Sequence, residues 1–183
     1  MSIVMDVAIL KECGYDMAKL AVSLNKKKNP DDMGPVVERL CDKGDGHNKC
    51  IEFIDVWLLI RAPRYWWSEC DTYRMRSMSS ESTMHTIMSE MQNASEQDIK
   101  SMFEVYPTMG TIDALLRCAD GNDLVGVKQH LPESFLQRRL LKVNYLTIRN
   151  MIKQRSTHRL PHWQQFCQYL KENLEHPELL KGL

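Results

Sequence analysis

The sequence predicts one mixed α/β domain. An apolar run at residues 53–60 has the hydrophobicity of a strand, whereas several other segments carry apolar residues at helical spacing. Turn residues separate these segments, and the 183 residues contain no internal repeat, low-complexity tract or linker that would divide them. A chain of this length can bury a core of its own, so we expect a single domain over residues 1–183.

The N-terminal part is predicted to contain one strand and two helices. Residues 3–10 form the first strand, and residues 16–25 form a helix with apolar residues on one side. A lysine-rich loop then leads to a second helix that begins near residue 31, where two aspartates favour a helix N-terminus. This helix ends at the turn 44–46.

The second strand leads into the polar stretch around which the chain is organised. His47 and Glu52 begin this strand after a glycine-rich turn, where side chains can face a cleft. Residues 61–85 then mix arginine, aromatic and hydroxyl side chains. Arginine supplies a fixed charge for phosphate, and aromatic faces stack on planar rings. The stretch is typical of a surface that receives a planar anion, although a solvated strand exit has the same composition.

The C-terminal part is predicted to be helical. Apolar residues at helical spacing mark the segments 82–91, 95–104 and 111–119. Asn144 is expected to cap a helix that runs from Tyr145 to Arg155, because asparagine is a favoured N-cap residue. Pro161 suits the first position of a final helix.

Charge and cysteine usage exclude several classes of protein. Lys+Arg 24 balances Asp+Glu 24, so no global field attracts nucleic acid or a membrane surface. The six cysteines lie far apart without a CxxC motif, which argues against a zinc ribbon or a disulfide framework and fits the reducing cytoplasm. No apolar segment reaches membrane-spanning length. We therefore expect a cytoplasmic protein without nucleic-acid or membrane partners.

Several candidate residues allow two interpretations. Ser82 is either the N-cap of a helix or an anion donor at a helix N-terminus, and it lacks the G-x-S-x-G context of a hydrolase nucleophile. Asn144 and Arg155 either cap and complement one helix or line a site. No second histidine or cysteine with ligand spacing lies near His47, so we expect no metal site.

The order and spacing of these residues resemble the flavin-dependent thymidylate synthases. That family carries the signature R-H-R-x-x-S-x-N-E-x-S-x-R-Y after an apolar strand. The matching segment here is TYRMRSMSSESTMH, in which Arg74, Ser77 and Ser82 fall in register. Upstream, the family's H-x-x-x-x-E matches His47 and Glu52.

Further matches extend the resemblance to roughly residues 15–170. Glu69 stands where the family has a glutamine shortly before the signature. Downstream, the family shows R-x-x-L-P followed by two asparagines and an arginine. The residues at the same intervals here are Lys128, Leu131, Pro132, Asn144, Asn150 and Arg155.

The resemblance implies a fold, a cofactor and a reaction. The implied fold is α+β, with a central, mainly antiparallel sheet flanked by helices, assembled as a homotetramer with sites shared between subunits. The implied reaction is methylene transfer from methylenetetrahydrofolate to C5 of dUMP, with NADPH as the reductant and hydride from reduced FAD.

The resemblance also assigns two sets of residues by position. The FAD set is His47, Glu52, Arg74, Asn144 and Asn150. The nucleotide set is Glu69, Ser82, Lys128 and Arg155, and within it Ser82 and Arg155 are the candidate catalytic residues.

The signature departs from the family at several positions. Thr72 and Tyr73 replace arginine and histidine, Ser79 and Ser80 replace asparagine and glutamate, and Met84 replaces an arginine. Losing a hydrogen bond to a charged group costs about 1.5–3 kcal/mol, so FAD binding is expected to be weak or lost. The sequence leaves two hypotheses: a flavin-dependent enzyme that modifies C5 of a deoxyuridine nucleotide, or a catalytically lapsed nucleotide-binding homologue that acts as a binding or regulatory oligomer.

Overall fold

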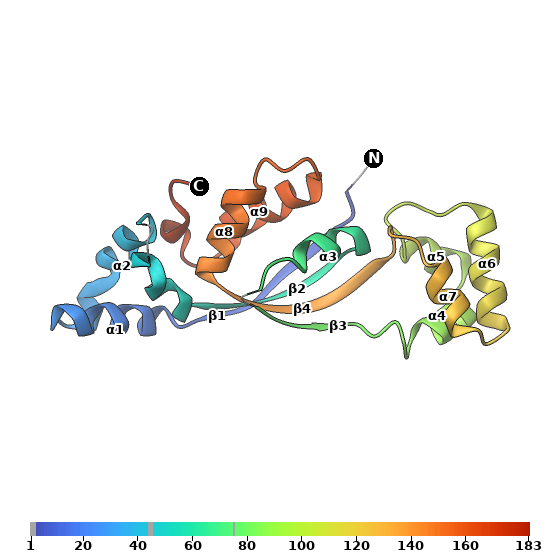
Figure 1. Cartoon of the computed structure of the whole chain (residues 1–183), viewed down its shortest axis with the longest axis horizontal. Helices are drawn as coiled ribbons and strands as arrows, with labels where there is room; N and C mark the ends of the chain where they lie inside the picture. Colours follow the sequence, from blue (N-terminus) through green and yellow to red (C-terminus); the bar gives the residue numbers. More distant parts are fainter. Residues whose placement is uncertain (1–2, 44–45, 75) are drawn as a thin grey trace. The chain divides into compact units, whose positions relative to one another are not determined.

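The computed structural model describes residues 3–43, 46–74 and 76–183. Within these residues, four strands form one antiparallel sheet in the order β1-β2-β4-β3. The strands are β1 (Asp6–Cys13), β2 (Asp55–Pro63), β3 (Arg76–Ser80) and β4 (Leu136–Asn144) (Figure 1). Helices flank this sheet, so the predicted α+β fold is confirmed.

The chain divides into two compact units, and β2, β3 and β4 each contribute residues to both. The first unit comprises Met1–Asp6, Arg61–Thr72 and Ser79–Arg139. The second unit comprises Val7–Ile60, Tyr73–Met78 and Leu140–Leu183. That residues 1–183 form one domain stays a prediction.

The first unit is built from short helices around an apolar core. The helices are α3 (Arg64–Cys70), α4 (Ile87–Asn93), α5 (Glu96–Ser101), α6 (Met109–Asp120) and α7 (Leu124–His130). Ile87, Leu115 and Val127 come from α4, α6 and α7 and are fully buried in one cluster. Helix α5 begins with a capping box between Ser95 and Asp98, which satisfies two otherwise unpaired N–H groups.

The second unit combines helices with the remaining strand segments. Its elements are α1 (Tyr15–Lys26), α2 (Gly34–Cys41), α8 (Tyr145–Arg155), α9 (Pro161–Asn173) and the 3₁₀ helices Pro30–Met33, His47–Phe53 and Pro177–Leu180. Helix α8 follows β4 without a loop (Figure 1). Val56, Leu58 and Ile60 alternate along β2 and are fully buried, as are Ile148 of α8 and Trp163 of α9.

Gly14 fixes the junction between β1 and α1. Its φ of 102° lies in the left-handed region, and a Cβ at this position would collide with the carbonyl oxygen of Phe53. The close approach of two backbones therefore holds the end of the 3₁₀ helix His47–Phe53 against the start of α1.

The structure corrects three of the predicted elements. The segment from His47 to Glu52 is a 3₁₀ helix, and β2 begins only at Asp55. Residues 82–86 form a turn, so Ser82 does not open a helix and α4 begins at Ile87. The first strand is Asp6–Cys13 rather than residues 3–10. The turn predicted at 44–46 lies partly outside the described residues.

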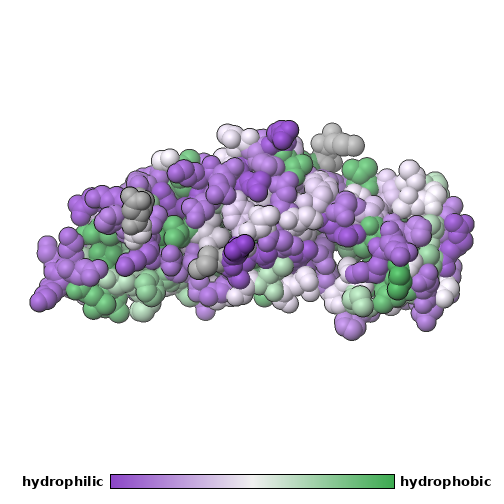
Figure 2. Space-filling view, in the orientation of Figure 1, coloured by the Kyte–Doolittle hydropathy of each residue, from purple (hydrophilic) through white to green (hydrophobic). Residues whose placement is uncertain are grey.

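Apolar side chains remain exposed on the second unit. Leu24 of α1 is 72% exposed, Phe53 is 57% exposed, and Met17 and Leu20 are also exposed. Figure 2 shows apolar side chains among hydrophilic ones over α1 and α2, at the left of the view. Within the described residues, no helix has the length and hydropathy needed to cross a membrane.

Candidate functional site

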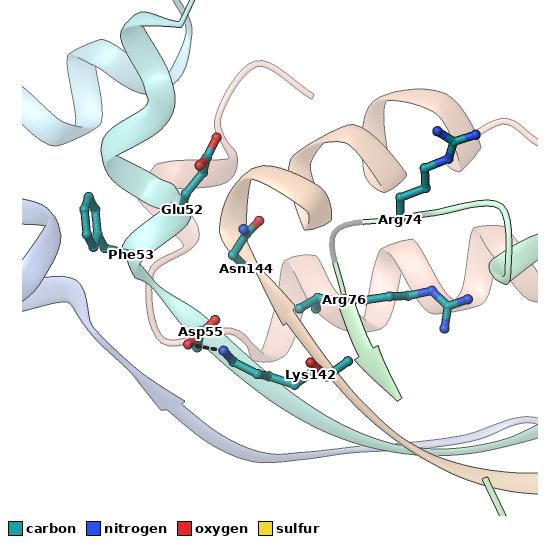
Figure 3. Close-up of a pocket in the computed structure, with 9 residues that line it drawn as sticks. Glu52, Phe53, Asp55, Arg74, Arg76, Lys142 and Asn144 are labelled. Atoms are coloured by element: carbon teal, nitrogen blue, oxygen red, sulfur yellow. Dashed lines mark ion pairs between the residues drawn. The ribbon is translucent and has the colours of Figure 1, made fainter. Parts of the chain in front are cut away.

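A cavity of about 540 Å³ lies in the second unit, where β4 ends and α8 begins. This volume is within the usual range of small-molecule sites. Three of the five residues of the FAD set line it: Glu52, Arg74 and Asn144 (Figure 3). The other lining residues are Phe53, Asp55, Arg76, Ser77, Lys142 and Val143.

Backbone hydrogen bonds place Asn144 at this cavity. Asn144 ends β4 and is the N-cap of α8, and its Oδ1 accepts the N–H of Thr147 at 2.9 Å. The next residue, Tyr145, donates its N–H to the carbonyl of Ile54 at 3.0 Å, which joins this corner to the segment that carries Glu52. The predicted cap is confirmed. Because the cap uses the amide oxygen, the NH₂ group is a separate donor.

Tyr145 anchors the start of α8. Its buried hydroxyl donates to the carboxylate of Glu12 on β1 and accepts the N–H of His176 at 3.2 Å. Burial and then the hydrogen bond to Glu12 raise the pKa of Tyr145 well above its ordinary value. The hydroxyl therefore remains a donor at neutral pH, and the helix that Asn144 caps is held to β1.

Two of the cations at the cavity are engaged with neighbouring groups. Lys142 pairs with Asp55 at 2.7 Å, as the dashed line in Figure 3 shows, and its ammonium also lies 5.5 Å from the ring centroid of Trp57. The Nε of Arg76 donates to the carbonyl of Tyr73 at 2.6 Å. In Figure 3 the Arg74 side chain extends away from Asn144, and Arg74 is exposed. Arg74 is thus an exposed cation at the edge of this cavity.

The chemistry of this donor set fits a flavin nucleotide. FAD requires a cation for its phosphates, hydrogen-bonding groups for its ring edge and ribose, and an apolar face for stacking. Arg74 supplies the cation, and Asn144 and Glu52 supply the hydrogen-bonding groups. The exposed ring of Phe53 supplies the apolar face. The residues present therefore match what this cofactor needs.

The other two members of the FAD set lie apart from this cavity. His47 is exposed at the start of its 3₁₀ helix and lines a second cavity of about 780 Å³ in the same unit. The two cavities share Glu52 and Phe53 as a common wall. Asn150 is exposed on α8 and is not among the residues that line either cavity.

The guanidinium of Arg155 lies beside the signature segment within the second unit. Arg155 Nε donates to the hydroxyl of Tyr73 at 3.2 Å, and Arg155 Nη1 lies 2.8 Å from Nε2 of His158. Its Cζ is 5.1 Å from the ring centroid of Trp163. The last turn of α8 therefore presents a half-buried cation that Tyr73, His158 and Trp163 contact.

The remaining members of the nucleotide set belong to the first unit. Lys128 of α7 donates to Oγ1 of Thr83 at 2.5 Å, which places its ammonium next to the turn that contains Ser82. The carbonyl of Ser82 accepts the N–H of Thr86 at 3.2 Å, so this turn is internally bonded. Ser82 and Lys128 are thus brought together, whereas Glu69 lies half-buried on α3.

Sequence inspection missed three features of these sites. The pair of Lys142 and Asp55 crosses two strands, and it was not found because β4 was not predicted. Phe53 appeared as the start of a buried strand, whereas its ring is exposed at both cavities. The contact of Tyr73 with Arg155 joins residues 82 positions apart, which no local spacing indicates. Across residues 3–43, 46–74 and 76–183, no group of three or more His, Cys, Asp or Glu side chains could hold a metal ion.

Solved structures of two enzymes have a fold similar to that of this chain. The flavin-dependent thymidylate synthase ThyX from Helicobacter pylori, complexed with FAD and dUMP, superposes with a TM-score of 0.79 at 18% identity, covering 96% of this chain and 98% of that chain. The fold is that of the flavin-dependent thymidylate synthases. A second crystal structure of the same enzyme with FAD and dUMP gives a TM-score of 0.78, also at 18% identity, and covers 97% and 98% of the two chains.

The same fold is also found in a UMP/dUMP methylase. The UMP/dUMP methylase PolB from Streptomyces cacaoi, bound with 5-Br dUMP, superposes with a TM-score of 0.66 at 14% identity and covers 92% of this chain and 89% of that chain. No protein-family model and no curated protein matches the chain by sequence. The likeness therefore resides in the fold.

Proposed function

We propose that this chain binds FAD and a deoxyuridine nucleotide and that it modifies C5 of the pyrimidine. The observation that carries the proposal is the fold, which matches a synthase crystallised with FAD and dUMP over 96% of the chain. The methylase bound with 5-Br dUMP supports the same class of nucleotide. The cavity lined by Glu52, Arg74 and Asn144 supports a flavin site.

In this proposal the members of the FAD set make different kinds of contact with the cofactor. Arg74 would pair with a phosphate of the cofactor, and the NH₂ of Asn144 would donate to an oxygen of its ring or ribose. Glu52 and His47 would accept and donate along the wall that the two cavities share, and Asn150 completes the set. Bound flavin supplies hydride to the pyrimidine when reduced.

The nucleotide set would bind and orient the second ligand. Arg155 would pair with the phosphate as a fixed cation, and Ser82 and Lys128 would add donors, as the resemblance assigns them. Glu69 would accept a hydrogen bond from the base or sugar. Ser82 and Arg155 are the candidate catalytic residues. Arg155 would orient the nucleotide through its phosphate, and a donor such as Ser82 held against the pyrimidine would stabilise the negative charge that develops on it.

Assembly and co-substrates belong to the same proposal. The exposed apolar side chains of Leu24 and Phe53 support a homo-oligomer, and we propose a homotetramer. Methylenetetrahydrofolate as one-carbon donor, NADPH as reductant and a cytoplasmic location follow from the resemblance and from the scattered thiols.

Two measurements test this function. Purified protein should bind FAD weakly, with a shift in the visible flavin spectrum that dUMP enhances. Tritium release from C5-labelled dUMP, in the presence of methylenetetrahydrofolate and NADPH, should be slow. Binding of dUMP without any flavin binding would identify a nucleotide-binding homologue instead. Binding of neither ligand would overturn the proposal.

A further inference from the structure

Tyr73 stands where the signature has its histidine, and its hydroxyl joins two consecutive residues at the end of α8. Arg155 Nε donates to the Tyr73 hydroxyl oxygen at 3.2 Å, and that hydroxyl donates to Oε1 of Gln154 at 2.9 Å. A guanidinium can only donate, so the phenol oxygen accepts from Arg155 and keeps its proton for Gln154. A hydroxyl accepts and donates through one atom, whereas each nitrogen of an imidazole does only one of these.

Two aromatic rings and an imidazole also contact Arg155. The guanidinium carbon lies 5.9 Å from the ring centroid of Tyr73 and 5.1 Å from that of Trp163, distances at which a cation is attracted to an aromatic face. The two ring centroids are 6.0 Å apart, and Trp163 is fully buried. His158 Nε2 lies 2.8 Å from Arg155 Nη1. Three separate segments therefore fix one guanidinium.

A fixed guanidinium binds an anion more tightly than a mobile one. Immobilising a long side chain on binding lowers affinity by roughly three- to tenfold. In this chain the contacts with Tyr73, Trp163 and His158 order Arg155 before any ligand arrives. The hydroxyl of Tyr73 contributes to this ordering because it engages Nε, at the base of the planar group.

We propose that Tyr73 is a positioning residue that holds Arg155 in the orientation that binds the phosphate of the nucleotide. The inference rests on the proposed function in one respect, the assignment of Arg155 as the phosphate ligand. The replacement of the signature histidine is then not simple erosion of a site. It exchanges an imidazole for a hydroxyl that serves Arg155 and Gln154 at once.

The first test compares Tyr73→Phe with the wild-type protein. This substitution keeps the ring beside Arg155 and removes only the hydroxyl. The dissociation constant for dUMP, measured by calorimetry, should rise roughly three- to tenfold, whereas that for deoxyuridine, which lacks the phosphate, should not change. Tyr65→Phe is the matched control, because it removes a hydroxyl that donates to Glu104 in the first unit. Unchanged binding of dUMP by Tyr73→Phe would overturn the proposal.

The second test asks whether Tyr73 acts through Arg155. In an Arg155→Gln background, Tyr73→Phe should have no further effect on dUMP affinity, because the group that it positions is gone. An equal loss of affinity in both backgrounds would show that Tyr73 contacts the ligand by itself, and the positioning role would be wrong.

Failure of the proposed function can be told apart from failure of this inference. Wild-type protein that does not bind dUMP contradicts the proposed function. Urea unfolding of the wild type, Tyr73→Phe, Arg155→Gln and the double variant still measures the coupling between Tyr73 and Arg155 without any ligand. Tyr73→Phe should then lower stability more when Arg155 is present than in the Arg155→Gln background, where only the hydrogen bond to Gln154 is lost. Fully additive effects of the two substitutions on stability would contradict the positioning role itself.

Discussion

Arg149 and Asp42 form an ion pair of 2.8 Å in which the arginine side chain is 8% exposed and the aspartate is 62% exposed. Arg149 also donates to the carbonyl of Leu179 in the last 3₁₀ helix. One guanidinium of α8 therefore joins the end of α2 to the C-terminal segment, and its buried position makes these contacts matter for stability.

Removing this guanidinium should destabilise the second unit. We expect Arg149→Ala to lower the free energy of unfolding by about 2–3 kcal/mol, because packing and two hydrogen bonds are lost. Asp42→Asn should cost about 1 kcal/mol, since water can replace much of the exposed carboxylate. Urea unfolding measures both. Lys181→Ala, which removes an exposed pair with Glu38, is the control and should leave stability close to that of the wild type.

Substitutions of Asn144 distinguish its proposed contact with flavin from its role as the N-cap of α8. Asn144→Asp keeps the acceptor that caps α8 but replaces the NH₂ donor with a negative charge, so FAD affinity should fall while the melting temperature stays near that of the wild type. Asn144→Ala should lower both and cost about 1 kcal/mol of stability. Flavin fluorescence titration and thermal melts give the two readouts. An Asn144→Asp variant that binds FAD normally would remove Asn144 from the FAD set.

Restoring the first two residues of the signature should strengthen FAD binding and weaken dUMP binding. Thr72→Arg together with Tyr73→His returns positive charge to the segment and should strengthen FAD binding if the site has only lost its charges. The same variant loses the Tyr73 hydroxyl that orients Arg155, so dUMP affinity should fall. Titrations of each ligand against the double variant and against Thr72→Arg alone test this. Tighter dUMP binding by the double variant would contradict it.

The cysteines should differ widely in reactivity. Burial raises the pKa of Cys41 to about 12 and that of Cys167 to about 11, so almost no thiolate exists at pH 8. Cys13 is exposed. We expect iodoacetamide at pH 8 to alkylate Cys13 first and the two buried thiols only after denaturation, as read by mass spectrometry. Because the folded state holds these two protons more tightly, their contribution to stability is present at neutral pH and is lost as pH rises toward 11–12.

Light scattering should report a homotetramer at micromolar concentration. The expectation rests on the resemblance and on the apolar side chains that α1 leaves exposed. A monomer under these conditions would also argue against sites shared between subunits.

The sequence predicted elements best where a local signal marks an end. Asn144 and Pro161 carry the capping preferences that begin α8 and α9, and both helices start as expected. Strands β3 and β4 were missed because the first reads RSMSS and the second contains two consecutive arginines, so neither shows the alternation of a half-buried strand. Their pairing is a tertiary property.

The candidate sites were predicted in part for the same reason. The spacing of the signature and of the matches before and after it identified Arg74, Glu52 and Asn144, which line one cavity. The partners that shape these sites, such as Lys142 for Asp55 and Tyr73 for Arg155, meet only after the chain folds. The 3₁₀ helix His47–Phe53 was not predicted because seven residues after a glycine are too few to show a period that separates a helix from a strand.

The N-cap role of Asn144 restricts which residues can occupy this corner as the protein diverges. Only Asn, Asp, Ser and Thr side chains, and to a lesser degree glycine, start a helix well, so mutational drift is channelled toward polar replacements at position 144 whether or not a ligand is used. A descendant that had abandoned flavin would therefore still present an amide, carboxylate or hydroxyl at the cavity wall. The requirement for a helix cap alone would keep a polar side chain at this wall of the cavity. Arg74 caps no helix, so this requirement would not restrict its replacement.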